Sequence, residues 1–216
     1  GRRPGVPRPL PRMTVTPVRV AVLASGGGTN LQSLLDGLNS TGSHTALVTR
    51  VISNRKDAGA LERARQAGVP ALTLSDHTNA EEYVDALGDA QLVVLTGYLK
   101  LIPATVVSRF QWRMINIHPA LLPDFGGPGM YGLRVHEAVL AAGRTESGAS
   151  VHYVTEEYDR GEVIARARVP VLPGDTGDSL AVRVLTAEHR LLPHVVSVLS
   201  LMGLPNHAVR LEDLDA

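Results

Sequence analysis

The 216-residue sequence contains no cysteine, and this absence limits the chemistry that it can use. It excludes a disulfide, a thiol nucleophile and a thiolate cluster for zinc or iron, so any catalysis must use histidine, carboxylate, hydroxyl or backbone groups. The eight histidines show no paired ligand spacing of the HExxH type, and we therefore expect no metal. His136, His189 and His194 are expected to be surface or structural residues of helices.

An excess of charge of either sign is also lacking. Lys+Arg and Asp+Glu both number 21, which gives a formal net charge of +0. A neutral chain has no long-range field with which to hold a polyanion, and this argues against nucleic acid and against an acidic membrane surface as partners. Any anion must therefore be bound by a local site.

Long hydrophobic runs are missing as well. No apolar stretch approaches the roughly 18 to 20 residues of a membrane span, and no uninterrupted signal-peptide core precedes Val18. Together with the absence of cysteine, this predicts a cytoplasmic protein.

Residues 1–17 hold five prolines and four arginines and are expected to be a flexible basic lead. A single domain should follow over 18–205, with a tail at 206–216.

From Val18 onward, apolar β-branched runs alternate with helical patterns. Strands are predicted at 18–24, 45–53, 71–74, 91–96 and 113–118, and helices at 30–38, 58–68, 80–87 and 103–110. This alternation predicts an α/β fold with a doubly wound, mostly parallel open sheet and helices on both faces. A helix at 133–143, two extended stretches at 148–155 and 162–171, and a helix from 178 to about 201 add a C-terminal β-hairpin plus helix.

A glycine-rich segment, Ser25-Gly-Gly-Gly-Thr-Asn30, lies between the first strand and the first helix. Glycine permits close backbone approach, and the exposed N–H groups at a helix start attract phosphate. The segment lacks the lysine of a P-loop, and Leu31 stands where a dinucleotide site needs a small residue, so a monophosphate is favoured over NAD or ATP. A tight turn in which Thr29 or Asn30 caps the helix remains an equal alternative.

Polar side chains at the end of the strand 113–118 are the candidates for catalysis. Asn116 and His118 are two residues apart and share a face, so an amide and an imidazole could meet an oxyanion and move a proton. Asp159, in a turn between two extended stretches, is the best-placed carboxylate, and beside His118 it would raise the imidazole pKa from about 6.5. A structural strand end and a simple Asp turn are the alternatives.

Several motifs in order resemble one family. They are SGGGTNLQ at 25–32, SN at 53–54, LERARQAG at 61–68, TGYLKLI at 96–102, NIHPALLP at 116–123, GASVHYVTEEYDRG at 148–161, and GDT at 174–176 followed by AEH at 187–189. From Val18 to about Pro205 the sequence resembles the phosphoribosylglycinamide formyltransferases, with their Rossmann-like fold. The resemblance implies transfer of a formyl group from 10-formyltetrahydrofolate to the amine of glycinamide ribonucleotide in de novo purine biosynthesis, without a metal.

The resemblance also implies the site residues. The implied partners are 10-formyltetrahydrofolate and glycinamide ribonucleotide, and the protein that binds them would be a monomer or a homodimer. Lys100 departs from the arginine that many members carry. The implied catalytic residues are Asn116, His118 and Asp159; the implied contacts to the ribonucleotide phosphate and ribose are Gly28, Thr29, Asn30 and Glu188; the implied folate contacts are Leu99, Lys100, Leu101, Ile102, Asn116, Val154 and Asp159.

Three other functions share parts of this pattern. A formyltransferase acting on methionyl-tRNA or an amino sugar nucleotide should carry a further domain after Pro205, and a formate-releasing hydrolase should carry a regulatory domain before Val18. A binding module without activity is argued against by the intact set of Asn116, His118 and Asp159.

Overall fold

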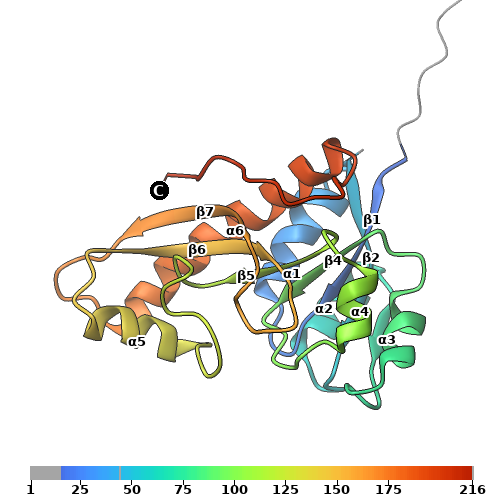
Figure 1. Cartoon of the computed structure of the whole chain (residues 1–216), viewed down its shortest axis with the longest axis horizontal. Coiled ribbons are helices and arrows are strands. Elements are labelled where there is room, and N and C mark those ends of the chain that lie inside the picture. The colour runs from blue at the N-terminus through green and yellow to red at the C-terminus, as the bar shows by residue number, and fades with distance from the viewer. Residues whose placement is uncertain (1–15, 44, 216) are drawn as a thin grey trace, which may run out of the picture.

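The computed structural model describes residues 16–43 and 45–215, so nearly all of the expected lead 1–17 lies outside the described residues. Within these residues, seven strands form one sheet with the order β3-β2-β1-β4-β5-β6-β7. Figure 1 shows the hairpin β6–β7 toward one end of the molecule and β1 and β2 toward the other. The predicted strands are confirmed within a few residues at each end. They are β1 (Val18–Leu23), β2 (Ala46–Ser53), β3 (Ala71–Thr73), β4 (Leu92–Thr96), β5 (Met114–His118), β6 (Glu146–Tyr153) and β7 (Val163–Pro170).

The strands β1 to β5 are parallel, and the hairpin β6–β7 is added in antiparallel pairing. The chain winds outward from β1 to β3 and then returns to place β4 on the other side of β1. At such a reversal the connections leave β1 and β4 in opposite directions, which opens a crevice at their carboxyl ends. The doubly wound sheet with a C-terminal hairpin and helix is therefore confirmed.

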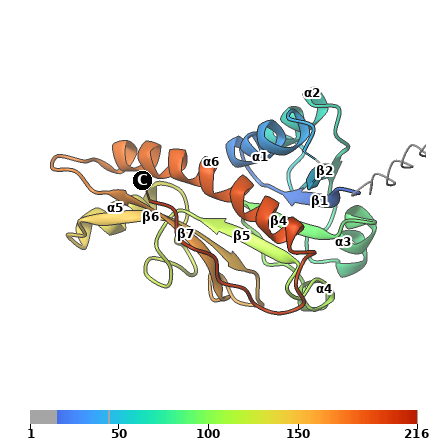
Figure 2. The ribbon, with the colours of Figure 1, turned by 90° about the horizontal axis from the view of Figure 1, so that it is seen from above.

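Helices cover both faces of the sheet because β1 is apolar on both. Val20 and Val22 face one core cluster, whereas Ala21 and Leu23 face the other, and all four are fully buried. Figure 2 shows α1, α2 and α6 on one side and α3 and α4 on the other. The helices are α1 (Thr29–Leu34), α2 (Gly59–Gln66), α3 (Ala80–Leu87), α4 (Ala104–Arg109), α5 (Leu133–Ala141) and α6 (Gly177–Leu201).

The first predicted helix differs from the expectation in its last turn. It widens into a π-helical turn, η1 (Leu35–Asn39), in which the Ser40 N–H donates to the Leu35 carbonyl at 2.9 Å. The Asn39 side chain then donates to the Val48 carbonyl and accepts from the Val48 N–H, both at 2.9 Å. This pair of bonds ties the end of the helix to β2, a contact that helical periodicity does not predict.

The C-terminal helix and tail cover the hairpin. A capping box between Thr176 and Ser179 starts α6, and α6 packs against β6, β7, α1 and α5. The tail then follows the free edge of β7, where the Leu214 N–H donates to the Arg166 carbonyl at 2.8 Å. Covering an edge strand in this way protects its unpaired backbone groups. None of the described helices combines the length and the apolar composition needed to cross a membrane.

Candidate active site

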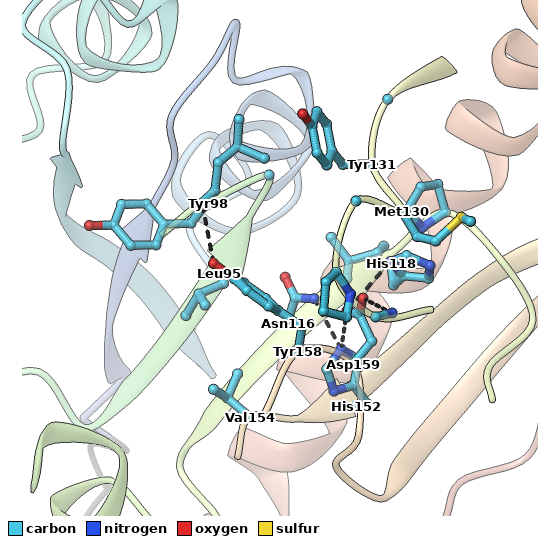
Figure 3. A pocket seen from close by; sticks show the side chains of 18 of the residues that line it. Leu95, Tyr98, Asn116, His118, Met130, Tyr131, His152, Val154, Tyr158 and Asp159 are labelled. Carbon is cyan, nitrogen blue, oxygen red and sulfur yellow. Dashed lines mark hydrogen bonds and ion pairs between the residues drawn. The ribbon is translucent and has the colours of Figure 1, made fainter. Parts of the chain in front are cut away.

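A cavity of about 840 Å³ lies beyond the carboxyl ends of β4 and β5. Its walls come from the segments 97–102, 127–133 and 154–159 and from one side of α6. It lies next to the point where the strand order reverses between β1 and β4, and Asn30, in the helix after β1, lines it. Figure 3 shows the side chains of Asn116, His118, His152 and Asp159 gathered within it.

The three residues predicted to be catalytic are brought together here. His118 and Asn116 end β5, and the chain returns 41 positions after His118 to place Asp159 Oδ1 at 3.5 Å from His118 Nδ1. The other ring nitrogen, Nε2, lies 2.8 Å from the carbonyl oxygen of Phe125, and Asp159 Oδ2 accepts from the Gly127 N–H at 2.9 Å. Both neighbours of the His118 ring are acceptors, so an imidazolium would find a partner for each of its N–H groups.

Burial nevertheless decides the pKa of His118. Removal from water lowers the pKa below its ordinary value, and Asp159 and the Phe125 carbonyl raise it by less. The expectation of a net raised pKa is therefore wrong, although the contribution of Asp159 has the predicted sign. Burial acts to raise the pKa of Asp159 itself, but three groups hold that pKa below the ordinary value: His152 when its ring carries a hydrogen on Nε2, the charge of His118, and the Gly127 N–H. Asp159 is thus a carboxylate at neutral pH.

Two histidines that sequence reasoning did not select line the same cavity. His152 on β6 is 2% exposed, with Nε2 3.0 Å from Asn116 Nδ2 and 3.4 Å from Asp159 Oδ1. His136 on α5 is only 5% exposed, and its Nδ1 has no partner within the described part of the chain. Its burial excludes the expected surface position, whereas a structural role stays a prediction although the residue lines the cavity. His194, by contrast, is exposed on α6 as expected, and His189 is half-buried.

The glycine segment packs tightly on the next helix. Gly28 has φ +78°, and a Cβ atom there would lie 2.7 Å from the Cα of Ala60 on α2. Gly28 is also the residue that precedes α1, and no side chain in the described part of the chain caps this helix. The capping alternative for Thr29 and Asn30 is therefore not what the structure contains. Gly26 and Gly27 behave differently, because a Cβ atom at either would meet nothing within 4 Å.

Only part of the expected phosphate and ribose site lines the cavity. Asn30 and Glu188 do, whereas Gly28 and Thr29 lie outside its lining. The Asn30 amide donates to Glu188 Oε1 at 3.4 Å, and Asn30 Oδ1 is buried without a partner among the described residues. Glu188 is 7% exposed, and burial raises its pKa to about 7.

The residues expected to contact folate all line the cavity. They are Leu99, Lys100, Leu101, Ile102, Asn116, Val154 and Asp159. Leu99 and Leu101 are 48% and 50% exposed, an unusual state for leucine that leaves apolar surface facing the opening. Ser25, at the end of β1, holds this segment because its hydroxyl accepts from the Leu99 N–H at 3.0 Å and donates to Asn54 at 2.6 Å. Within 16–43 and 45–215, no three His, Asp or Glu side chains are grouped to hold a metal ion.

Comparison with known proteins decides the family. Residues 18–196 match the family model described as formyl transferase. The chain belongs to the formyl transferase family. It is 40% identical over 189 residues to the phosphoribosylglycinamide formyltransferase of Escherichia coli, covering 83% of this chain and 86% of that one. It is 44% identical over 190 residues to a chloroplastic phosphoribosylglycinamide formyltransferase of Arabidopsis thaliana, covering 84% of this chain and 65% of the relative.

Solved structures agree with this membership. The glycinamide ribonucleotide transformylase 1 of Symbiobacterium toebii has a TM-score of 0.79 and 39% identity, over 92% of this chain and 95% of that one. A formyltetrahydrofolate deformylase from Pseudomonas syringae has the same TM-score of 0.79 but only 24% identity, over 91% of this chain and 66% of that one, and so shares the fold alone. The chain spans slightly less than two thirds of the two chloroplastic relatives, 65% and 62% of their length.

Proposed function

We propose that this formyl transferase moves the formyl group of 10-formyltetrahydrofolate to the primary amine of glycinamide ribonucleotide, yielding formylglycinamide ribonucleotide and tetrahydrofolate in de novo purine biosynthesis. One observation carries the proposal: Asn116, His118 and Asp159 meet in one cavity between the segment 99–102 and α6. The donor and the acceptor could therefore approach the same three side chains from opposite sides.

The folate would lie on the side of the cavity formed by the segments 99–102 and 154–159. The exposed side chains of Leu99 and Leu101 offer apolar contact, and the backbone of both segments offers donors and acceptors to a pteridine. Lys100 adds a point charge rather than the planar fork of an arginine, so a carboxylate of the donor would be held with less directional control.

The acceptor would lie between α6 and the glycine segment. Asn30 and Glu188 would contact the ribose, because a buried amide and carboxyl provide donors and acceptors for hydroxyl groups. The phosphate would extend past this cavity to the backbone of Gly28 and Thr29 at the start of α1. Open space above Gly26 and Gly27 supports such an approach.

In the proposed mechanism, the acceptor amine attacks the formyl carbon, and the carbonyl oxygen becomes an oxyanion. An Asn116 amide hydrogen donates to this oxygen, and so does the His118 Nε2–H, which lies against the Phe125 carbonyl in the free protein and would leave it for the oxyanion. Loss of one such donor should cost about two to four kcal/mol of transition-state stabilisation. The new C–N bond to the acceptor forms as the tetrahedral intermediate appears, and the bond to the folate nitrogen breaks as that intermediate collapses. One proton moves from the amine to that nitrogen, and Asp159 assists through bound water.

The lowered pKa of His118 fits a role that changes with the reaction. In the free protein at neutral pH the ring is largely neutral. A negative charge on the tetrahedral intermediate would favour the imidazolium, just as Asp159 does from the other side. His118 could then accept a proton as the oxyanion forms and release it as the intermediate collapses.

The test measures the absorbance of deformylated folate with glycinamide ribonucleotide present and absent. Formation of tetrahydrofolate only with the acceptor supports the transferase. Acceptor-independent formation together with free formate would identify a hydrolase, and no turnover would identify a binding module. Either result would refute the proposal.

Three further assignments accompany the proposed function. The formyltransferase domain is assigned to 18–205. A cytoplasmic location stays a prediction, because two relatives carry chloroplastic names, and cell fractionation tests it. The choice between monomer and homodimer is tested by light scattering of the purified chain.

A further inference from the structure

Asn116 and His152 lie directly opposite each other in the antiparallel pair β5–β6. Their side chains point to the same face of the sheet and meet in the cavity, where Asn116 Nδ2 is 3.0 Å from His152 Nε2 (Figure 3). His152 is 2% exposed and Asn116 is half-buried, so water does not compete freely for this contact. The contact therefore restrains how the Asn116 amide can turn.

The other nitrogen of the His152 ring determines which hydrogen bond is possible. Its Nδ1 lies 2.8 Å from the carbonyl oxygen of Tyr153. A carbonyl oxygen can only accept, so Nδ1 must carry a hydrogen, and in the neutral ring Nε2 then presents a lone pair. A lone pair attracts an N–H and repels a carbonyl oxygen. Asn116 must consequently turn Nδ2, and not Oδ1, toward His152.

We propose that His152 is a positioning residue that fixes the amide orientation of Asn116 for the formyl transfer. The inference rests on the proposed function, in which Asn116 donates to the oxyanion. Nδ2 carries two hydrogens: His152 accepts one and leaves the other for the substrate oxygen. With the amide turned over, Oδ1 would take the place of Nδ2, and the donor to the oxyanion would be lost.

Asp159 is the group that competes for the same ring nitrogen. Its Oδ1 lies 3.4 Å from His152 Nε2, which is longer than the contact with Asn116. Were the ring doubly protonated, Nε2 would donate to Asp159 and could accept nothing from Asn116. The proposal therefore requires a hydrogen on Nδ1 alone while the enzyme is active.

The kinetic test compares His152→Leu with His152→Gln. Leucine removes the acceptor and should lower kcat by about 10- to 10²-fold with KM for both substrates nearly unchanged, because the amide is disordered and not deleted. Glutamine can place an oxygen near the position of Nε2 and should restore most of kcat. Val151 precedes His152 on β6 and points to the opposite face of the sheet, into a core cluster. Val151→Ala is therefore the control, because it loses core packing without touching Asn116. It should lower the thermal midpoint and spare kcat.

A double variant separates positioning from a general structural effect. If His152 acts through Asn116, then His152→Leu combined with Asn116→Leu should turn over no more slowly than Asn116→Leu alone. Multiplied losses in the double variant, or normal turnover in His152→Leu, would overturn the proposal. Loss of kcat in Val151→Ala as large as that in His152→Leu would overturn it too.

An NMR measurement tests the inference without depending on turnover. Nitrogen-15 spectra of the His152 ring in the unmodified protein at neutral pH should show a hydrogen on Nδ1 and none on Nε2. A hydrogen on Nε2, alone or together with one on Nδ1, would contradict the proposal. If the unmodified protein transfers no formyl group, the proposed function fails, whereas the ring tautomer still decides whether His152 can orient Asn116.

Discussion

Replacing Glu188 by glutamine should stabilise the folded protein at alkaline pH and have a much smaller effect under mildly acidic conditions. Glu188 is 7% exposed, and burial raises its pKa from the ordinary 4.5 to about 7. Its one side-chain partner within 16–43 and 45–215, the Asn30 amide at 3.4 Å, is too distant to compensate for the loss of water. The carboxylate form is therefore disfavoured in the fold, and a neutral amide of the same shape avoids that cost.

The sign and size follow from proton linkage. Because the folded protein holds this proton more tightly than the unfolded chain, the stabilisation from the protonated carboxyl is complete below about pH 4.5 and is lost as the pH rises through about 7. The difference between these two pKa values corresponds to about 3 kcal/mol. Relative to the native protein, Glu188→Gln should therefore gain about 3 kcal/mol at about pH 8 and about 1 kcal/mol at about pH 5.

Urea unfolding of both proteins at these two pH values measures the difference. Glu212→Gln, which changes an exposed carboxyl, is the matched control and should give no pH-dependent gain. An equal effect of Glu188→Gln at both pH values would refute the reasoning, because it would mean that folding does not change the pKa of Glu188. A loss of stability confined to alkaline pH would refute it as well, since the carboxylate would then have a favourable partner.

Three other predictions address the proposed site. Gly27→Ala should fold normally, because its Cβ meets no described atom within 4 Å, yet it should raise KM for the ribonucleotide, because that Cβ would occupy space proposed for the phosphate. Gly28→Val should instead lower the thermal midpoint, because its side chain would collide with Ala60. An unchanged KM in Gly27→Ala would mean that the phosphate does not bind at this loop. Asn116→Leu should lower kcat by about 10²- to 10³-fold with ligand binding retained, and near-normal turnover would exclude it from the mechanism. Asp159→Asn should lower the pKa of His118 further in an NMR titration, because Asp159 now raises it; an unchanged value would mean that the two residues do not interact.

Local patterns account for most of the predicted elements. Continuous apolar runs such as Leu92–Thr96 identify strands buried on both faces, and regular spacing of leucine and valine identifies α6. The widened turn at Leu35–Asn39 escaped prediction because its cause is the bond from Asn39 to β2, a partner that the helix pattern does not contain.

Sequence motifs located the candidate catalytic residues, since Asn116 and His118 share a face by strand periodicity alone and Asp159 was selected from its turn and from the family resemblance. The motifs could not show that His152 belongs to the site. Its place opposite Asn116 depends on the register between β5 and β6, which long-range packing of the hairpin decides. Strand alternation with Val151 and Tyr153 could have put it on the correct face, but not beside a particular partner.

The sequence by itself determined the layers of this protein, the loop at the start of α1 and its family, because each depends on neighbouring residues or on ordered motifs. Only the tertiary structure decided which groups lose water. Burial reversed the expected pKa shift of His118, raised that of Glu188, placed His136 in the cavity and set Gly28 against α2. The physical reason is that solvation depends on every element packed around a side chain, and those elements come from distant parts of the chain.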